Sequence, residues 1–266
     1  MTSLLARGKE VRERWWPVLR ESAFLARGVL TPEEFVAAGD ELVYKCPTWS
    51  WSAGDEVRRK RYLPETKQFL VTTNVPCAER AAAMEGAVMT SADDEDDWVA
   101  PSLAKDVTEE TIETIGEKTT EDDELAGLED ATISADEATS SADKILRTRT
   151  YDLSITYDKY WQTPRMWFFG YDENAQPLSQ AQVFEDIILD YARRTVTFEL
   201  HPHLEGSLHA SIHPCKHPAA MKRILDTLVS KKDANPRPDQ ALFIFLKFLQ
   251  SVVPTINYDF TQEVEV

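Results

Sequence analysis

The whole net charge of this 266-residue chain lies in one internal segment, residues 79–146. This segment has 21 acidic and four basic residues, a balance of −17 that equals the formal net charge of the full chain. Trp98 is its single aromatic residue. A segment so acidic and so poor in aromatic side chains cannot bury enough apolar surface to offset the entropy lost on folding. We therefore predict a disordered acidic insertion at residues 79–146, with a folded core built from the residues on its two sides.

The composition outside the insertion is that of a globular protein with a balanced charge. The chain is 42% hydrophobic and 10% aromatic, which supplies one sizeable core. The strongly acidic internal segment argues against nucleic-acid binding. Cys46, Cys77 and Cys215 are odd in number and scattered, which indicates a reducing, cytoplasmic compartment without a disulfide framework. Charged residues from Arg7 onward interrupt the apolar start, so we expect neither a signal peptide nor a membrane span.

Residues 1–25 predict an amphipathic, basic helix, with a break or a second helix at Pro17 because proline removes a backbone donor. An apolar face with tryptophan and arginine residues beside it is typical of a helix that lies in a membrane surface. The candidate membrane-binding residues are Leu4, Leu5, Val11, Trp15 and Val18. A terminal helix packed on the core is the alternative.

Residues 26–78 and 147–266 predict the two parts of one α+β core. Thr31 followed by Pro32 and two glutamates marks the start of a helix that runs to about Val43, and residues 49–73 indicate an antiparallel meander. The predicted fold is an antiparallel sheet of about four strands flanked by helices. The second part predicts strands at residues 147–157, 166–171 and 194–200 and helices at residues 179–191, 218–229 and 240–253.

All five histidines lie between His201 and His217, and Cys215 lies among them. A thiol acts as a nucleophile when it is ionised, and nearby imidazolium, lysine and a helix N-terminus favour the thiolate. Cys215 precedes the helix predicted at residues 218–229, whose unpaired N–H groups would stabilise a thiolate or an oxyanion. Cys215 is therefore the candidate nucleophile, and His213 is a candidate for steering the thiol.

Five motifs on both sides of the insertion resemble the autophagy-related protein 3 family. They are Thr31-Pro32-Glu33-Glu34-Phe35-Val36-Ala37-Ala38-Gly39-Asp40, Lys67-Gln68-Phe69-Leu70-Val71-Thr72, Tyr151-Asp152-Leu153-Ser154-Ile155-Thr156-Tyr157-Asp158-Lys159-Tyr160, Ser211-Ile212-His213-Pro214-Cys215-Lys216-His217 and Phe245-Leu246-Lys247-Phe248. The resemblance implies a fold related to ubiquitin-conjugating enzymes. It also implies a thioester intermediate: a ubiquitin-like protein of the autophagy-related protein 8 type passes from its activating enzyme, of the autophagy-related protein 7 type, to Cys215. From there it is transferred to the amine of phosphatidylethanolamine.

The same resemblance implies roles for the terminal helix and the insertion. The helix would bring Cys215 to curved membrane, so that the protein is cytoplasmic and peripheral on autophagic membranes. The insertion would dock the activating enzyme and the ligase-like complex of autophagy-related proteins 12 and 5. Trp98, Ile112 and Ile115 are the candidate docking residues in it. The reaction implies no metal and no organic cofactor.

The chain departs from ubiquitin-conjugating enzymes at the run that precedes their cysteine. Those enzymes carry His-Pro-Asn, whose asparagine steadies the oxyanion, and here the comparable run is His201-Pro202-His203. His203, a hydroxyl of Thr195 or Thr197 on the preceding strand, or backbone N–H groups are the candidate replacements.

Three readings of the histidine–cysteine cluster compete with acyl transfer. His209, His213, Cys215 and His217 have the ligand types of a zinc site, although the spacing and Pro214 fit one poorly. A cysteine hydrolase would need a partner acid or an oxyanion loop that the sequence does not display. A non-catalytic scaffold would have a buried, inert cysteine, so the exposure of Cys215 separates this reading from the enzyme.

Overall fold

The computed structural model describes residues 17–77, 79–81, 148–187, 195–230, 235–256 and 258. Most of the predicted insertion and most of the predicted terminal helix lie outside these residues. The candidate residues Leu4, Leu5, Val11, Trp15, Trp98, Ile112 and Ile115 lie there too.

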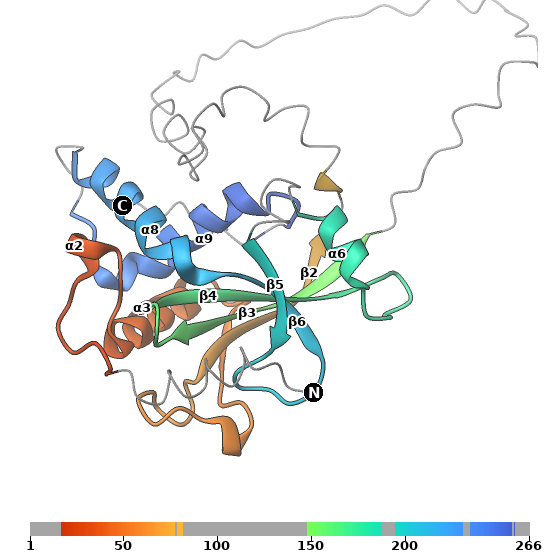
Figure 1. The fold of residues 1–266 in the computed structure, drawn as a ribbon, viewed down its shortest axis with the longest axis horizontal. Coiled ribbons are helices and arrows are strands. Elements are labelled where there is room, and N and C mark those ends of the chain that lie inside the picture. The colour runs from red at the N-terminus through yellow and green to blue at the C-terminus, as the bar shows by residue number, and fades with distance from the viewer. Residues whose placement is uncertain are drawn as a thin grey trace, which may run out of the picture.

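The described residues form a six-stranded antiparallel sheet with helices packed against it (Figure 1). This confirms the predicted fold class, although about four strands were expected. The strand at residues 208–212 was not predicted, whereas the equally short strand at residues 196–200 was. The strands are β1 (Ser50–Ser52), β2 (Phe69–Cys77), β3 (Arg149–Asp158), β4 (Thr163–Tyr171), β5 (Val196–Leu200) and β6 (Leu208–Ile212), in the order β1-β2-β3-β4-β6-β5.

Three long helices carry most of the helical packing, and two of them begin as predicted from local sequence. α3 starts after Thr31, whose side chain accepts the backbone N–H of Glu34 while the Glu34 side chain accepts that of Thr31. α8 starts at His217, directly after the cysteine segment. The helices are α2 (Phe24–Arg27), α3 (Pro32–Lys45), α6 (Gln180–Glu185), α8 (His217–Ser230) and α9 (Ala241–Val252), with short 3-10 turns η1 (Glu56–Arg58), η2 (Pro214–Lys216) and η3 (Pro238–Gln240).

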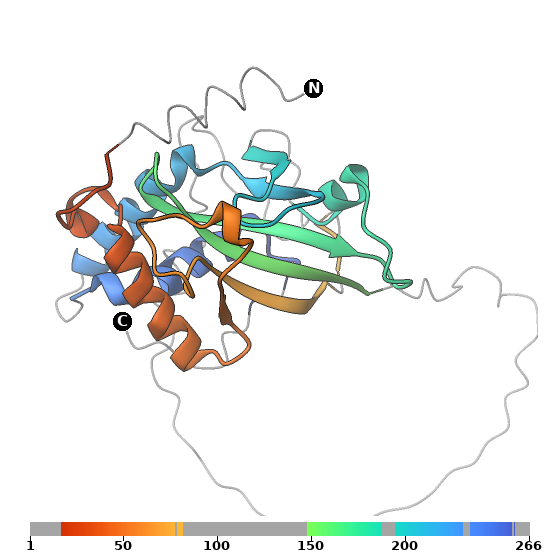
Figure 2. The ribbon, with the colours of Figure 1, turned by 90° about the horizontal axis from the view of Figure 1, so that it is seen from below.

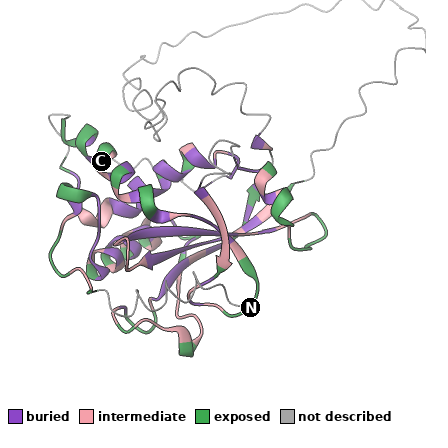
Figure 3. Cartoon of the chain, in the orientation of Figure 1, coloured by how far each residue is buried: buried purple, intermediate pink, exposed green. Residues whose placement is uncertain are grey.

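The apolar core lies between the sheet and the helices α3, α8 and α9 (Figures 2 and 3). Alternation along β3 turns Leu153 and Ile155 into this core, and their register partners on β4, Phe168 and Met166, lie beside them. α9 buries nine of its twelve residues, which confirms the predicted burial of this apolar helix.

Two predicted helices are shorter than expected. α6 ends at Glu185, and residues 186 and 187 are not helical; Asp186 follows the helix and its side chain is buried in an ion pair with Arg149. Of the predicted terminal helix, the structure describes residues 17–25; residues 17–23 are not helical, and Val18 is half-buried in this stretch. Proline removes the donor that a continuous helix needs there.

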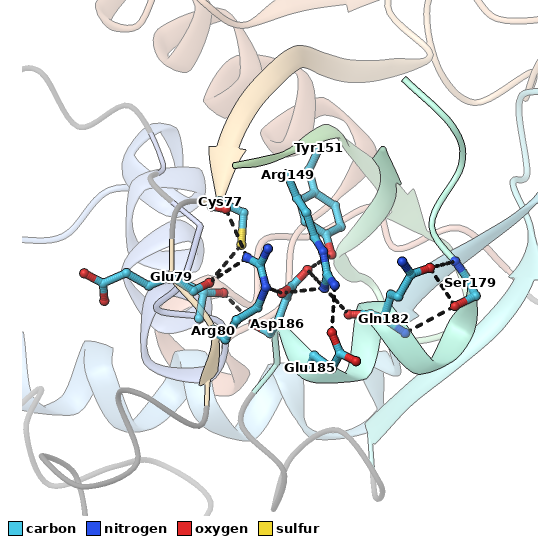
Figure 4. Close-up of polar contacts among 10 residues, drawn as sticks. Cys77, Glu79, Arg80, Arg149, Tyr151, Ser179, Gln182, Glu185 and Asp186 are labelled. Atoms are coloured by element: carbon cyan, nitrogen blue, oxygen red, sulfur yellow. Dashed lines mark hydrogen bonds and ion pairs between the residues drawn. The ribbon is translucent and has the colours of Figure 1, made fainter. Parts of the chain in front are cut away.

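The two strands that flank the insertion leave the sheet side by side, at a buried cluster of charges (Figure 4). Cys77, the last residue of β2, is the register partner of Arg149, the first residue of β3. Arg149 donates to both carboxylate oxygens of Asp186 at 3.0 Å, and Arg80 Nε lies 3.4 Å from the same carboxylate. Tyr151 donates to it at 2.5 Å. One buried carboxylate therefore holds the chain just before and just after residues 82–147.

Candidate functional site

Cys215 lies at the end of the sheet opposite to the charge cluster, in the turn η2 between β6 and α8. Its side chain is exposed, whereas Cys46 and Cys77 are buried. Burial raises the pKa of the Cys77 thiol to about 11, which keeps it protonated and unreactive. Of the three cysteines, Cys215 is therefore the one that a macromolecular substrate can reach.

The backbone around Cys215 is fixed by hydrogen bonds from both sides. The N–H of His213 donates to the carbonyl of Thr195 at 2.7 Å, which continues the β5–β6 pairing by one residue. The N–H of Cys215 donates to Nδ1 of His213 at 3.3 Å, so His213 caps the turn η2. The structure thus brings together three predicted residues: Cys215, His213 and Thr195.

His217 anchors the other side of the cysteine segment. It is buried, it donates through Nδ1 to the carbonyl of Pro164 at 2.9 Å, and its ring contacts Phe245 and Phe248 at centroid distances of 5.3 and 5.5 Å. Burial lowers the pKa of His217 to about 3, so the ring is neutral at physiological pH. His217 therefore holds the start of α8 on β4 and is not a proton carrier for the thiol.

The turn between β3 and β4 lies beside residues 213–217 and contacts His213. Asp158 shapes the turn by accepting the backbone N–H groups of Tyr160 and Trp161, both at 3.0 Å. The Trp161 ring then meets the His213 ring edge-on at a centroid distance of 6.0 Å. Sequence reasoning missed Trp161; the aspartate at the head of a turn between two strands was the available signal.

The segment that follows the predicted terminal helix packs on the same end of the sheet. Leu30 makes two hydrogen bonds there through its backbone. Its carbonyl accepts from the Tyr157 hydroxyl at 2.7 Å, and the N–H of Leu30 donates to the carbonyl of Gln162 at 2.8 Å. Gly28 has φ +67° and approaches α8 so closely that a Cβ there would lie 2.4 Å from the carbonyl of Pro218. Residues 28–30 are therefore wedged between the β3–β4 turn and the first turn of α8.

Thr195 and Thr197, both predicted as oxyanion candidates, differ in their surroundings. Thr195 is buried beside His213, as described above. The hydroxyl of Thr197 donates to Glu199 at 2.9 Å and accepts from Arg165 at 3.3 Å. The Thr197 hydroxyl thus takes part in an ionic network, whereas Thr195 is tied to the cysteine segment through its backbone carbonyl.

His203 packs on the sheet. The chain after β5 folds back across the face that the helices leave free, and His203 stacks on Phe69 at 5.4 Å with an interplanar angle of 20°. Its neighbour His201 lies 3.1 Å from the Ser154 hydroxyl and also contacts Trp167. Burial lowers the pKa of His203 to about 3. These contacts give His203 a packing role, and the geometry lends no support to its predicted part in holding an oxyanion.

The geometry also bears on the zinc alternative. His217 uses its Nδ1 on Pro164 inside the core, and His209 packs on Phe169 at 4.9 Å. Within the described ranges, no group of three or more histidine, cysteine, aspartate or glutamate side chains is placed to hold a metal ion.

None of the described helices is long and apolar enough to cross a membrane.

The arrangement as a whole fits acyl chemistry on an exposed thiol. Cys215 stands two residues before a 14-residue helix, whose first N–H groups carry partial positive charge. The backbone on either side of Cys215 is bound to Thr195 and to β4, and His213 caps the turn η2. The thiol is therefore attached to a fixed backbone although it is open to solvent.

Comparisons with known proteins found one family model and several relatives of similar length. Residues 34–260 match a family model described as "Autophagocytosis associated protein, active-site domain". The chain is 47% identical to "Autophagy-related protein 3" from Arabidopsis thaliana, over 92% of this chain and 91% of the relative. It is 42% identical to the protein of the same name from Dictyostelium discoideum, over 94% of each. A third relative of that name, from Pichia angusta, is 34% identical over 99% of each chain.

Proposed function

Since the chain belongs to the autophagy-related protein 3 family and is a conjugating enzyme of autophagy, we propose that Cys215 carries a ubiquitin-like protein of the autophagy-related protein 8 type as a thioester. The acceptor in the second step is the amine of phosphatidylethanolamine. The observation that supports this most directly is the contrast between the exposed Cys215, held at its backbone from two sides, and the buried Cys46 and Cys77.

The proposed reaction consists of two acyl transfers. In the first, the sulfur of Cys215 attacks the carbonyl carbon of the thioester on the activating enzyme, whose thiolate leaves. In the second, the lipid amine attacks the carbonyl of the new thioester, loses a proton to solvent or to a base, and forms an amide while the Cys215 thiolate leaves. A thiolate is a better leaving group than an alkoxide or amide, so the carrier makes the amide-forming step accessible.

The residues around the thiol have proposed roles in these steps. The positive end of the α8 dipole would stabilise the oxyanion of each tetrahedral intermediate by its field, since the N–H of His217 is bound to the carbonyl of Pro214 and Pro218 has no N–H to donate. The hydroxyl of Thr195 is the candidate for additional support. His213 would act by capping η2, which sets the direction from which Cys215 enters the first turn of α8.

Outside the described residues, the proposed roles rest on sequence and family. Residues 1–25 would bind curved membrane through Leu4, Leu5, Val11 and Trp15, together with Val18, the one of these five that the structure describes. The insertion would dock the activating enzyme, of the autophagy-related protein 7 type, and the ligase-like complex of autophagy-related proteins 12 and 5, with Trp98, Ile112 and Ile115 as docking residues. This protein would then be cytoplasmic and peripheral on autophagic membranes.

The test is to incubate the protein with the activating enzyme, ATP and the processed ubiquitin-like protein, and to separate the products on a non-reducing gel. We expect wild type to form an adduct that thiol reduction removes, and Cys215→Ser to form a reduction-resistant ester. Cys46→Ala is the matched control and should load like wild type, because Cys46 is buried. If wild type forms no adduct, or if the adduct survives the loss of Cys215, the proposal is wrong and a scaffold role becomes the better one.

A further inference from the structure

The hairpin formed by β5 and β6 is joined to the rest of the sheet by few backbone pairs. β3 and β4 share nine register pairs, and β5 and β6 share five. Between β4 and β6 the register has two pairs, Trp167↔Ser211 and Phe168↔Ala210. The first four residues of β4, at positions 163–166, have no register partner on β6, so side chains rather than a backbone ladder connect this Cys215 end of β4 to the hairpin.

Arg165 fills this separation. Its side chain is almost fully buried, with 2% of its surface exposed. Nε donates to the hydroxyl of Ser211 on β6 at 2.7 Å, and Nη2 donates to Glu199 on β5 at 2.9 Å. Nη1 lies 4.0 Å from the carboxylate of Asp158, which shapes the β3–β4 turn. The guanidinium also lies over the ring of Trp167, at 4.3 Å from its centroid.

The segment at residues 213–217, which contains Cys215, is bound to the same two parts of the sheet that Arg165 connects. On the hairpin side, the N–H of His213 is bound to Thr195, one residue before β5. On the β4 side, His217 is bound to Pro164, the residue next to Arg165. The separation between these two supports sets where Cys215 lies relative to the start of α8.

We propose that Arg165 is a positioning residue for acyl transfer at Cys215: its guanidinium fixes the β5–β6 hairpin against β4 and the β3–β4 turn where the backbone ladder is missing. The proposal rests on the proposed function of Cys215. Arg165 does not touch the reacting atoms; it acts through Ser211, Glu199 and Asp158. A planar fork with several directed donors suits this task, and a lysine ammonium does not reproduce it.

A buried ion pair that only stabilises the fold is the competing interpretation, and it predicts different behaviour of a double variant. Replacing both partners of a buried pair with apolar residues often restores stability, because no charge is left unpaired. Arg165→Met with Glu199→Met should therefore recover much of the thermal stability that Arg165→Met loses. It would not recover the directed bonds that hold the hairpin in one place.

The experiment measures discharge in a single turnover. Each variant is loaded with the ubiquitin-like protein, the activating enzyme is stopped by removing ATP, and loss of the thioester to free ethanolamine is followed over time. The variants are Arg165→Met, Arg165→Lys and Arg165→Met with Glu199→Met. Arg149→Met is the matched control, since it also removes an arginine paired with a buried carboxylate but lies at the other end of β3. Thermal denaturation is recorded for each.

We expect discharge to slow about tenfold or more in all three Arg165 variants, because small misplacements of a reacting group are costly. Arg149→Met should discharge like wild type despite a lower melting temperature. If Arg165→Met discharges like Arg149→Met, or if the double variant regains wild-type discharge together with its stability, Arg165 is structural only and the inference is wrong. If wild type does not load at all, it is the proposed function that fails.

Discussion

At the scale of single residues, the three cysteines show how burial divides chemistry among identical side chains. Cys215 is exposed on a turn, while Cys46 and Cys77 lie in the core. Because burial raises the pKa of Cys77 to about 11, little of its thiolate exists near neutral pH. Reactivity is therefore set by position in the fold.

This contrast predicts a selective alkylation. In the native protein, iodoacetamide should modify Cys215 much faster than the other two thiols, since both access and thiolate are needed. The measurement is mass spectrometry of peptides after timed quenching, and denaturant supplies the control in which all three should react. Equal rates for Cys215 and Cys77 in the native protein would contradict the burial described here.

How far the sequence predicts the site depends on what each residue's role needs. Cys215 could be predicted because its position before a helix is a local property, and His213 because it is two residues away. His203 could not be placed, because the direction of its ring depends on a chain that folds back over Phe69, a contact across 134 positions. Arg165 was missed because its partners are on strands 32 to 46 residues away.

At the scale of elements, the starts of the long helices were predicted well, and the short strand β6 was not predicted. α3 begins where Thr31 and Glu34 cap each other, a signal contained in four residues. The strand β6 has five residues and forms by pairing with β4 and β5. Its own sequence shows too little alternation to predict a strand.

The approach of residues 28–30 to α8 predicts that Gly28→Ala will destabilise the protein by about 2 kcal/mol or more, since φ is positive and the new Cβ meets backbone. Gly206→Ala is the matched control: φ is +123°, but nothing lies within 4 Å of the added Cβ. Urea denaturation should show the larger loss for Gly28→Ala. Equal losses would mean that the packing against Pro218 and Lys222 contributes nothing beyond backbone strain.

At the scale of the whole molecule, buried neutral histidines make stability depend on pH. Burial lowers the pKa of His201 to about 2 and that of His203 and His217 to about 3, against 6.5 in the unfolded chain. Between pH 6.5 and about 3, these three histidines are therefore mostly protonated in the unfolded state and mostly neutral in the folded state. The stabilising effect of keeping these rings neutral is complete above pH 6.5 and diminishes as the pH falls through this window.

We therefore expect the free energy of unfolding to fall by at least about 1 kcal/mol for each pH unit below pH 6.5. Urea denaturation at a series of pH values measures this slope. His203→Phe keeps a ring on Phe69 and removes one titrating group, so its slope should be shallower than that of wild type. An unchanged slope in this variant would show that His203 is not kept neutral by the fold.

The charge cluster predicts a second global effect. Burial raises the pKa of Asp186, although the nearby arginines and the Tyr151 hydroxyl favour the carboxylate. Asp186→Asn leaves Arg149 and Arg80 without that carboxylate and should cost about 3 to 5 kcal/mol, as for other broken buried pairs. Glu185→Gln is the control: it removes an exposed partner of Arg149 and should cost about 1 kcal/mol or less. Thermal denaturation decides between them, and similar melting temperatures would refute a stabilising role for the cluster.

The pairing of Cys77 with Arg149 has a consequence for how the family can change. The two ends of the intervening segment are fixed as neighbours by the sheet and by Asp186, whatever the segment between them contains. For a flexible segment, the closure entropy grows only with the logarithm of its length, so doubling it costs about 0.6 kcal/mol. If the segment is flexible, insertions and deletions in it would be nearly neutral for folding, so its sequence could change while the end of the sheet that carries Cys215 stays as it is.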